Sequence, residues 1–340
     1  EYHLVFAEMV ERVQAYCEER GVPFLFVFDP AKPAVYSDKL ADGISYNREW
    51  VDEFFAELDR RGVNYLDNTE TLRGARAAGV EVFNRKYDAN HWNDLGAFYG
   101  TQKIQERLRE FFPEQHVNQL YEFERSEELE TSLPFSAFPI EEFVPILTAK
   151  SGVLALTEDY DGMAIDPSYP YFAYLANDER QSEGAGRVLM FQGSYMNGRG
   201  SKFMEQALGE YIAVHDYSNI LNLPYYFNLF EPDCVVFEVA EYTLNSTYFN
   251  LEQMQKLDFN PVLSLPEGGW MAAKAFDGVS LERQGALWRI FWETEEEPRY
   301  VWARVGGRTI DLLATEGGYA ADIRADELDF GAGIELYTEP

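Results

Sequence analysis

The chain has 340 residues, 46% of them apolar and 16% aromatic, so it can bury a large core and hold one large or two smaller domains. Its 59 acidic and 28 basic residues give a net charge of −31, which repels phosphate backbones and anionic lipids and argues against nucleic-acid binding. Cys17 and Cys234 lack metal-type spacing and are expected to be buried free thiols, and no apolar run reaches the ~18 residues that a membrane span needs.

The first hundred residues alternate predicted helices with predicted buried strands. Apolar residues from Phe6 to Cys17 recur at helical spacing, and residues 23–28 form an apolar run of strand length. A second helix is expected from Val51 to Leu58, and a short strand follows at 63–66. A third helix should begin at Asn93-Asp94, because Asn and Asp are favoured as helix caps. Such alternation indicates an α/β fold with a mostly parallel sheet.

Residues 113–185 interrupt this alternation. The segment combines a charge-rich stretch at 122–130, three prolines between residues 134 and 145, and a region rich in Asp, Tyr and Gly at 159–183. Long irregular connections of this kind in compact proteins are commonly functional loops. We therefore expect an inserted lid or loop region over the edge of the sheet.

The alternation resumes with a strand predicted at 187–192, a helix that carries Phe203 to Ile212, and a buried strand from Cys234 to Val239. From about residue 270 short β runs separated by Gly-rich turns predict a small antiparallel β domain at 270–340. The main domain is then expected to span residues 1–265.

The chemistry of the chain points to two loops. Ser194 follows its predicted strand by two residues, and Asp88 precedes His91 by three residues just before a predicted helix. In an open α/β sheet, ligands bind beyond the carboxyl ends of the strands, so both loops can meet at one edge. His91 would then take the proton of Ser194, while Asp88 would accept the other ring N–H. Each motif alone is also compatible with an ordinary turn or a packed histidine.

An acyl-transfer site also needs donors for a developing oxyanion. The backbone N–H of Tyr195 is adjacent to the serine, and Asn197 and the N–H of Gly198 are further candidates. Lys32 and Tyr36 follow the first core strand at its carboxyl end, where they are expected to face the same cleft and hold substrate.

These motifs resemble the SGNH-hydrolase-like proteins typified by the alginate O-acetyltransferases, together with the related DHHW proteins. In that group Asp and His precede the serine, as they do here, and an Asp, a His-Trp pair and a Gly-Ala pair enter a helix. Asp88, His91-Trp92 and Gly96-Ala97 match this order, and 191–195 looks like the family's serine block. The resemblance covers roughly residues 1–250. It implies a three-layer α/β/α domain and adds Trp92 to the expected substrate-binding residues.

Two departures from the family pattern bear on the site. The Gly-x-Asn-Asp block, which supplies an oxyanion Asn in standard SGNH esterases, is absent, and Glu238-Val239-Ala240-Glu241-Tyr242 stands in its place. The family's acidic ending finishes in Arg, whereas this chain has Tyr242. The source of the oxyanion donors is therefore open at this point.

The expected function is serine-dependent O-acetyl transfer to, or removal from, an exported or cell-envelope polysaccharide through an acetyl-serine. The resemblance implies no metal or organic cofactor and a membrane-bound partner that supplies acetyl groups. It also implies an extracellular or cell-surface location, with an N-terminal signal or anchor lying outside this sequence. The alternative is a non-catalytic carbohydrate-binding or assembly protein, in which Trp288, Trp292 and Trp302 stack on sugars rather than pack in a core.

Overall fold

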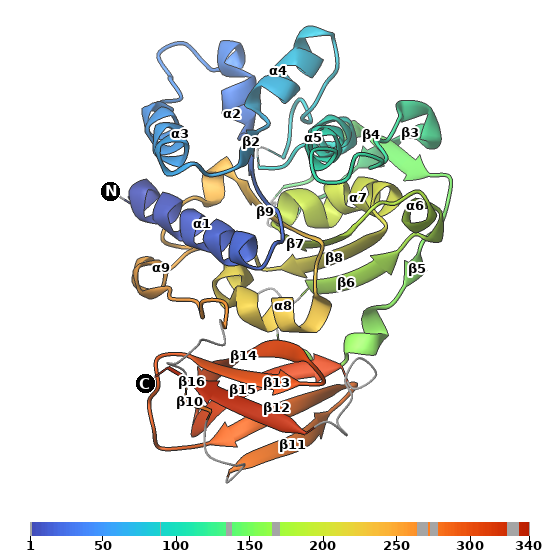
Figure 1. The fold of residues 1–340 in the computed structure, drawn as a ribbon. Coiled ribbons are helices and arrows are strands. Elements are labelled where there is room, and N and C mark those ends of the chain that lie inside the picture. The colour runs from blue at the N-terminus through green and yellow to red at the C-terminus, as the bar shows by residue number, and fades with distance from the viewer. Residues whose placement is uncertain are drawn as a thin grey trace.

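A seven-stranded main sheet lies between two layers of helices, and a second sheet packs below it (Figure 1). The structure is a computed structural model that describes residues 2–88, 90–133, 138–164, 171–263, 271–272, 278–324 and 333–339. The strand order of the main sheet is β2-β1-β9-β7-β8-β6-β5. The pairs from β2 to β8 are parallel, and β6 and β5 add an antiparallel edge. The predicted α/β class, with an additional antiparallel β region near the C-terminus, is confirmed.

The strands of the main sheet are β1 (Phe24–Asp29), β2 (Tyr65–Asp67), β5 (Leu154–Ala155), β6 (Tyr171–Ala176), β7 (Arg187–Phe191), β8 (Glu210–His215) and β9 (Cys234–Ala240). The helices around it are α1 (Tyr2–Glu19), α2 (Lys32–Val35), α3 (Glu49–Arg61), α4 (Thr69–Ala77), α5 (Asp94–Leu108), α6 (Asp178–Ser182), α7 (Ser201–Ala207), α8 (Leu223–Phe230) and α9 (Leu251–Lys256). Short helical turns are η1 (Ser37–Lys39), η2 (Leu120–Glu122), η3 (Thr157–Tyr160), η4 (Met196–Gly200), η5 (Tyr217–Asn222) and η6 (Glu241–Thr243). None of the helices within the described ranges is long and apolar enough to cross a bilayer.

Successive residues of a strand point to opposite faces, and β1 shows how the two cores arise. Phe24, Phe26 and Phe28 pack in one cluster with α1, α3 and α8. Leu25 and Val27 pack in the other cluster with residues of α4, α5 and α7. Both faces are therefore covered, which explains why the strands read as continuous apolar runs in the sequence. Cys17 and Cys234 are buried and free, as predicted.

Local signals in the sequence set the helix ends. The side chain of Asn93 accepts a hydrogen bond from the Gly96 N–H at 3.0 Å, so it caps α5 as expected. Gly62 ends α3 in the left-handed conformation at φ 70°, which glycine adopts without steric cost.

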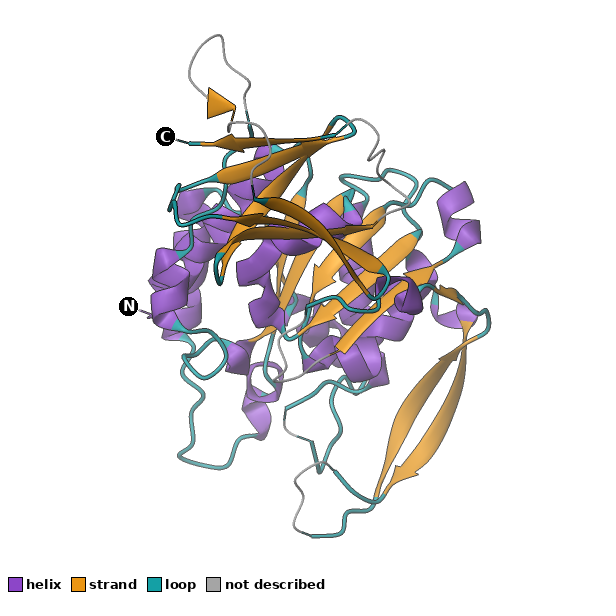
Figure 2. Ribbon diagram, turned by 90° about the horizontal axis from the view of Figure 1, so that it is seen from below, coloured by secondary structure: helices purple, strands orange, loops and turns teal. Residues whose placement is uncertain are grey.

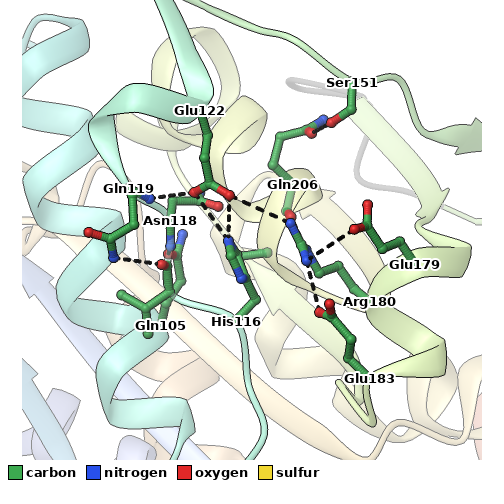
Figure 3. A network of polar contacts seen from close by, with 12 residues as sticks. Gln105, His116, Asn118, Gln119, Glu122, Ser151, Glu179, Arg180, Glu183 and Gln206 are labelled. Atoms are coloured by element: carbon green, nitrogen blue, oxygen red, sulfur yellow. Dashed lines mark hydrogen bonds and ion pairs between the residues drawn. The ribbon is translucent and has the colours of Figure 1, made fainter.

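The segment 113–185 is more regular than the loop region predicted for it. Two of its strands, β5 and β6, extend the main sheet. The strands β3 (Phe123–Glu130) and β4 (Glu142–Ala149) form an antiparallel ribbon that stands apart from the main sheet in Figure 2. Figure 3 shows how the start of this segment is held: Glu122 contacts the ring of His116 at 3.0 Å and the guanidinium of Arg180 in α6 at 3.7 Å. Whether the segment is an insertion stays a prediction.

The second sheet contains seven strands in the order β10-β16-β13-β14-β15-β12-β11. Its strands are β10 (Met271–Ala272), β11 (Val279–Gln284), β12 (Leu287–Glu293), β13 (Val301–Val305), β14 (Arg308–Thr315), β15 (Gly318–Arg324) and β16 (Ile334–Thr338). The pairs are antiparallel. The predicted domain boundary near residues 265–270 lies outside the described residues. Trp302 is fully buried and Trp292 is 8% exposed, so neither presents a face to sugars. Trp292 packs in the core of this sheet, whereas the indole N–H of Trp302 donates to the carbonyl of Pro261 at 3.1 Å.

Buried polar contacts join the second sheet to the main unit. Asp311 of β14 accepts hydrogen bonds from the Tyr16 hydroxyl at 2.7 Å and from Arg20 at 3.0 Å, next to the end of α1. The amide of Asn228 in α8 donates to the backbone carbonyl of Asp311 at 2.8 Å. The side chains of Asp311 and Arg20 are only 5% and 14% exposed, so this ion pair lies largely out of water.

We predict that Asp311→Ala lowers the free energy of unfolding by about 3 kcal/mol, because it leaves the buried Arg20 without its carboxylate. Urea unfolding would measure this change. The matched control is Asp258→Ala, which removes a carboxylate that pairs with the exposed Arg299 and should cost less than about 1 kcal/mol. Equal effects of the two substitutions would show that the contact at Asp311 does not hold the sheets together.

Candidate functional site

Ser194 lies on the tight turn that leaves the carboxyl end of β7. The carbonyl of Gly193 accepts hydrogen bonds from the backbone N–H groups of Met196 and Asn197, and so it starts the helical segment that contains Ser194. A Cβ at Gly193 would lie 2.1 Å from the Tyr217 ring, so only glycine fits at this position. Figure 1 shows the neighbouring strands β9, β7 and β8 running side by side, which brings their following loops to one edge.

Ser194, His91 and Asp88 form one chain of hydrogen bonds. Nε2 of His91 lies 2.9 Å from Oγ of Ser194, and Nδ1 of His91 lies 3.0 Å from Oδ1 of Asp88. The expected contact across 103 residues of sequence is therefore present. The side chain of His91 is 33% exposed and that of Asp88 10% exposed, so the imidazole can be reached from solvent while the carboxylate is covered.

The backbone and an arginine hold Asp88 in this position. Asp88 has a φ of 54°, in the left-handed region that Asp adopts more readily than most residues. Nη2 of Arg199 lies 3.6 Å from Oδ2 of Asp88, and Nη1 donates to the carbonyl of Trp92 at 2.5 Å. Burial by itself would raise the pKa of Asp88, but the hydrogen bond from His91, with the charges of His91 and Arg199, outweighs it and holds that pKa below its ordinary value.

Arg199 comes from η4, a single π-helical turn directly after the nucleophile turn. Such turns occur often at functional sites. Sequence reasoning did not find Arg199, because no propensity signal marks a π turn. The two neighbouring glycines, Gly198 and Gly200, were the nearest hint.

Trp92 was predicted to contact substrate, and this prediction is wrong. Its side chain is fully buried, and its indole N–H donates to the carbonyl of Tyr195 at 2.8 Å. A Cβ on Gly100 of α5 would lie 2.4 Å from the Trp92 ring, so this glycine makes room for the indole, whereas a Cβ on Gly96 would lie 2.2 Å from the carbonyl oxygen of Val82. Trp92 therefore ties the histidine loop to the serine turn from inside the core.

The three predicted oxyanion donors, Tyr195, Asn197 and Gly198, differ in their surroundings. Tyr195 lies at the start of the helical segment, where first-turn N–H groups lack intrahelical acceptors, so its backbone N–H remains a candidate beside that of Ser194. The amide oxygen of Asn197 accepts a hydrogen bond from Gln192 at 2.6 Å, which turns this side chain toward the protein. Gly198 is exposed, with open space around it, so no close approach requires a glycine there.

Lys32 lies near the triad and Tyr36 is directed elsewhere. Nζ of Lys32 donates to the carbonyl of Asn84 at 2.5 Å. Burial lowers the pKa of Lys32, although the nearby charges of Glu142 and Asp88 act in the opposite direction. The hydroxyl of Tyr36 accepts from the Val82 N–H at 3.3 Å, so the recorded polar contact of this side chain is with the backbone and not with the triad.

A further hydroxyl lies beside the nucleophile. Oη of Tyr242, in η6 at the end of β9, is 3.0 Å from Oγ of Ser194. Sequence reasoning noted Tyr242 only as a departure from the family pattern. Its position after a strand that ends at the same edge as β7 is the signal that could have identified it.

Two buried acids lie under the serine turn. Oε2 of Glu238 accepts the N–H of Gly193 at 2.7 Å, and Asn68 donates to Oδ1 of Asp29 at 2.7 Å. Burial raises the pKa of both carboxyl groups, and the charge of Asp29 further disfavours ionisation of Glu238. Oδ2 of Asp29 and Oε1 of Glu238 have no hydrogen-bond partner among the described groups, so we expect the pair to share a proton.

No group of three His, Cys, Asp or Glu side chains in the described parts of the chain is arranged to hold a metal ion.

Comparisons with known proteins agree with this fold. Residues 6–135 match the model of the SGNH hydrolase-like domain of the acetyltransferase AlgX, a region that includes Asp88 and His91. Bacillus cereus PatB1 with a sulfonyl adduct is 17% identical, with a TM-score of 0.56 over 74% of this chain and 92% of that one. The O-acetyltransferase domain of Pseudomonas putida AlgJ is 16% identical, with a TM-score of 0.50 over 75% and 89%. The resemblance to the SGNH-hydrolase-like proteins is thus confirmed. No curated protein matches the chain.

The buried acid pair predicts a pH dependence of stability. Folding raises the pKa of Asp29 and Glu238 above their values of about 4 in the unfolded chain. At a pH above about 4, the folded state therefore binds more protons than the unfolded chain does at the same pH. The stability contribution of the pair is therefore greatest in acid and falls toward neutral and alkaline pH.

Replacing Asp29 by Asn keeps the acceptor for Asn68 and provides an amide donor to Glu238. The acid pair should make the parent lose unfolding free energy between pH 5 and pH 8. We expect Asp29→Asn to lose less over the same range, as measured by urea unfolding at both pH values. Asp59→Asn makes the same change on α3, where Tyr65 is the partner of Asp59, and should leave the pH difference unaltered. An unchanged difference in Asp29→Asn would contradict the shared proton.

Proposed function

We propose that this protein transfers an acetyl group to, or removes one from, an exported or cell-envelope polysaccharide through an acetyl-serine at Ser194. The observation that carries the proposal is the chain of hydrogen bonds from Ser194 through His91 to Asp88 at the carboxyl edge of a parallel sheet. The family match and the similar folds of two proteins, one of them the O-acetyltransferase domain of AlgJ, support the same chemistry.

Each step has a residue to perform it. Nε2 of His91 takes the proton of Ser194 as Oγ attacks the acetyl carbonyl, and Asp88 keeps the imidazole in the required tautomer and stabilises its charged form. When the tetrahedral intermediate collapses, His91 returns the proton to the leaving group of the donor. A sugar hydroxyl then attacks the acetyl-serine and gives its proton to His91. The bond between the acetyl carbon and Oγ breaks, and His91 returns the proton to Oγ of Ser194, which leaves the O-acetylated sugar; water in place of the sugar gives acetate. A membrane-bound partner that supplies acetyl groups remains part of the proposal.

The non-catalytic alternative loses one of its two supports from the sequence. Of the three tryptophans expected to form a sugar-stacking face, Trp292 and Trp302 are buried. The absent Gly-x-Asn-Asp block, its other support, stands.

The charge of the chain also bears on the acceptor. A net charge of −31 repels polyanions at long range, and Lys32 and Arg199, which lie near the triad, are already engaged by protein acceptors. We therefore propose that the acceptor is a polysaccharide without a dense row of carboxylates.

Purified protein should hydrolyse an activated acetyl ester slowly, because an acetyl-serine reacts with water when no sugar is present. Ser194→Ala should remove this activity, and His91→Ala should reduce it nearly as much, since members of a triad act as a unit. Asp88→Asn should lower kcat by about 10²- to 10⁴-fold through the wrong imidazole tautomer. Ser182→Ala, on the exposed helix α6, is the control and should retain full activity.

Mass spectrometry after brief exposure to the ester should find one acetyl group on the peptide that contains Ser194. Equal hydrolysis by the parent and Ser194→Ala, with no acetyl-serine trapped, would exclude the proposed mechanism.

Acceptor choice gives a separate test of the substrate. With the activated ester as donor, acetyl transfer to neutral oligosaccharides should exceed transfer to a polyuronate at low ionic strength. The difference should narrow as salt is added, because screening shortens the range of the repulsion. Product masses would measure both. Preference for the polyuronate at low salt would contradict the proposed acceptor class but leave the acetyl-serine mechanism intact.

A further inference from the structure

The hydrogen bonds of His91 determine which atom donates in the contact between Tyr242 and Ser194. Oγ of Ser194 lies 2.9 Å from Nε2 of His91 and 3.0 Å from Oη of Tyr242. When Asp88 accepts the Nδ1–H of His91, Nε2 has no proton and must accept the single proton of Ser194. The remaining contact of Oγ then requires Tyr242 to be the donor. Burial raises the pKa of Tyr242 to about 12, so the phenol keeps its proton near neutral pH.

Attack by the serine changes which atom needs that donor. In the tetrahedral intermediate, Oγ is bonded to the acetyl carbon, and the negative charge lies on the carbonyl oxygen attached to the same carbon. A donor that contacts Oγ beforehand is therefore only a small displacement from the developing oxyanion, which is where a preorganised hydrogen bond accelerates the reaction. The hydrogen bond to Oγ in the resting state, in contrast, weakens the nucleophile.

The structure holds the backbone of Tyr242 on both sides. The preceding residue, Glu241, has a fully buried side chain that accepts the Ala31 N–H at 3.0 Å and Nε of Arg48 at 2.9 Å. The carbonyl of Tyr242 itself accepts a hydrogen bond from the side chain of Asn245 at 2.8 Å. These contacts preorganise the hydroxyl before substrate arrives.

We propose that Tyr242 is a catalytic residue that donates its hydroxyl proton in a hydrogen bond to the oxyanion, in the role that an Asn side chain has in standard SGNH esterases. The inference rests on the proposed acetyl-serine chemistry. It places a side-chain donor opposite the backbone N–H groups of Ser194 and Tyr195, so that the oxyanion is held from two elements, η6 and the serine turn.

The test is Tyr242→Phe, which removes one oxygen and keeps the ring. For hydrolysis of an activated acetyl ester we expect kcat to fall by about 10²- to 10³-fold with little change in KM, as for the loss of one oxyanion donor elsewhere. The control is Tyr248→Phe, which removes a phenol six residues away whose ring packs on Tyr217, and it should retain the parent rate. Circular dichroism and urea unfolding would confirm that both variants fold.

The direction of the effect separates the possible roles of the hydroxyl. If Tyr242 served only as a hydrogen-bond donor to resting Ser194, its loss would leave the rate unchanged or raise it, because the nucleophile would be freed. Such a result would overturn the proposal while the parent activity, and its loss in Ser194→Ala, left the acetyl-serine mechanism standing.

A second measurement does not depend on turnover. A sulfonyl fluoride should label Ser194 through a sulfonyl group whose oxygens need the same donors. The labelling rate, followed by intact mass, should fall at least tenfold in Tyr242→Phe and remain unchanged in Tyr248→Phe. Equal labelling of Tyr242→Phe and the parent would overturn the role of Tyr242. A parent protein whose Ser194 reacts with neither the ester nor the sulfonyl fluoride would overturn both the role and the proposed function.

Discussion

The candidate site depends on the parallel pairing of β7 with β9 and of β9 with β1. Parallel strands end at the same edge of a sheet, so three segments from different parts of the chain meet there without long connections. β1 brings Lys32, β7 brings Ser194, and β9 brings Tyr242. The histidine loop enters from the side, at the start of α5, and Trp92 fixes it against the serine turn.

The serine turn is held by a buried acidic side chain. The N–H of Gly193 donates to the fully buried carboxyl of Glu238 at 2.7 Å. Burial beside Asp29 disfavours ionisation of Glu238 and raises the pKa of both carboxyl groups, so we expect the pair to retain a proton. The turn that presents the nucleophile is thus stabilised by groups that disfavour folding at high pH. Similar trade-offs between stability and a functional geometry are common at active sites.

Much of the fold could be predicted from the sequence, because apolar periodicity and helix caps are local signals. Phe24 to Phe28 read as a buried strand, and Asn93 as the cap of α5, without knowledge of the rest of the chain. Asp88, His91 and Ser194 could also be found, since each occupies a recognisable loop after or before a regular element.

Other features could not be predicted because they depend on contacts between distant segments. β5 and β6 carry no sign of which strand they pair with, and Trp92 has the same sequence context whether it faces solvent or core. Arg199 and Tyr242 acquire their roles only through neighbours that are more than forty residues away in the chain: Asp88 in one case and Ser194 in the other.

The π turn at Met196–Gly200 makes the site sensitive to the number of residues in this turn. A π-helical turn carries one residue more than an α-helical turn, so a single deletion within it can be absorbed by reverting to regular α-helix without disturbing α7. We expect a deletion between residues 196 and 198 to rotate Arg199 around the helix axis and away from Asp88. The local environment of the acid can therefore be altered by one codon of length rather than by a change of side chain. Insertion or loss of a residue here is a simple route by which the charge around Asp88 could change while every member of the triad stays in place.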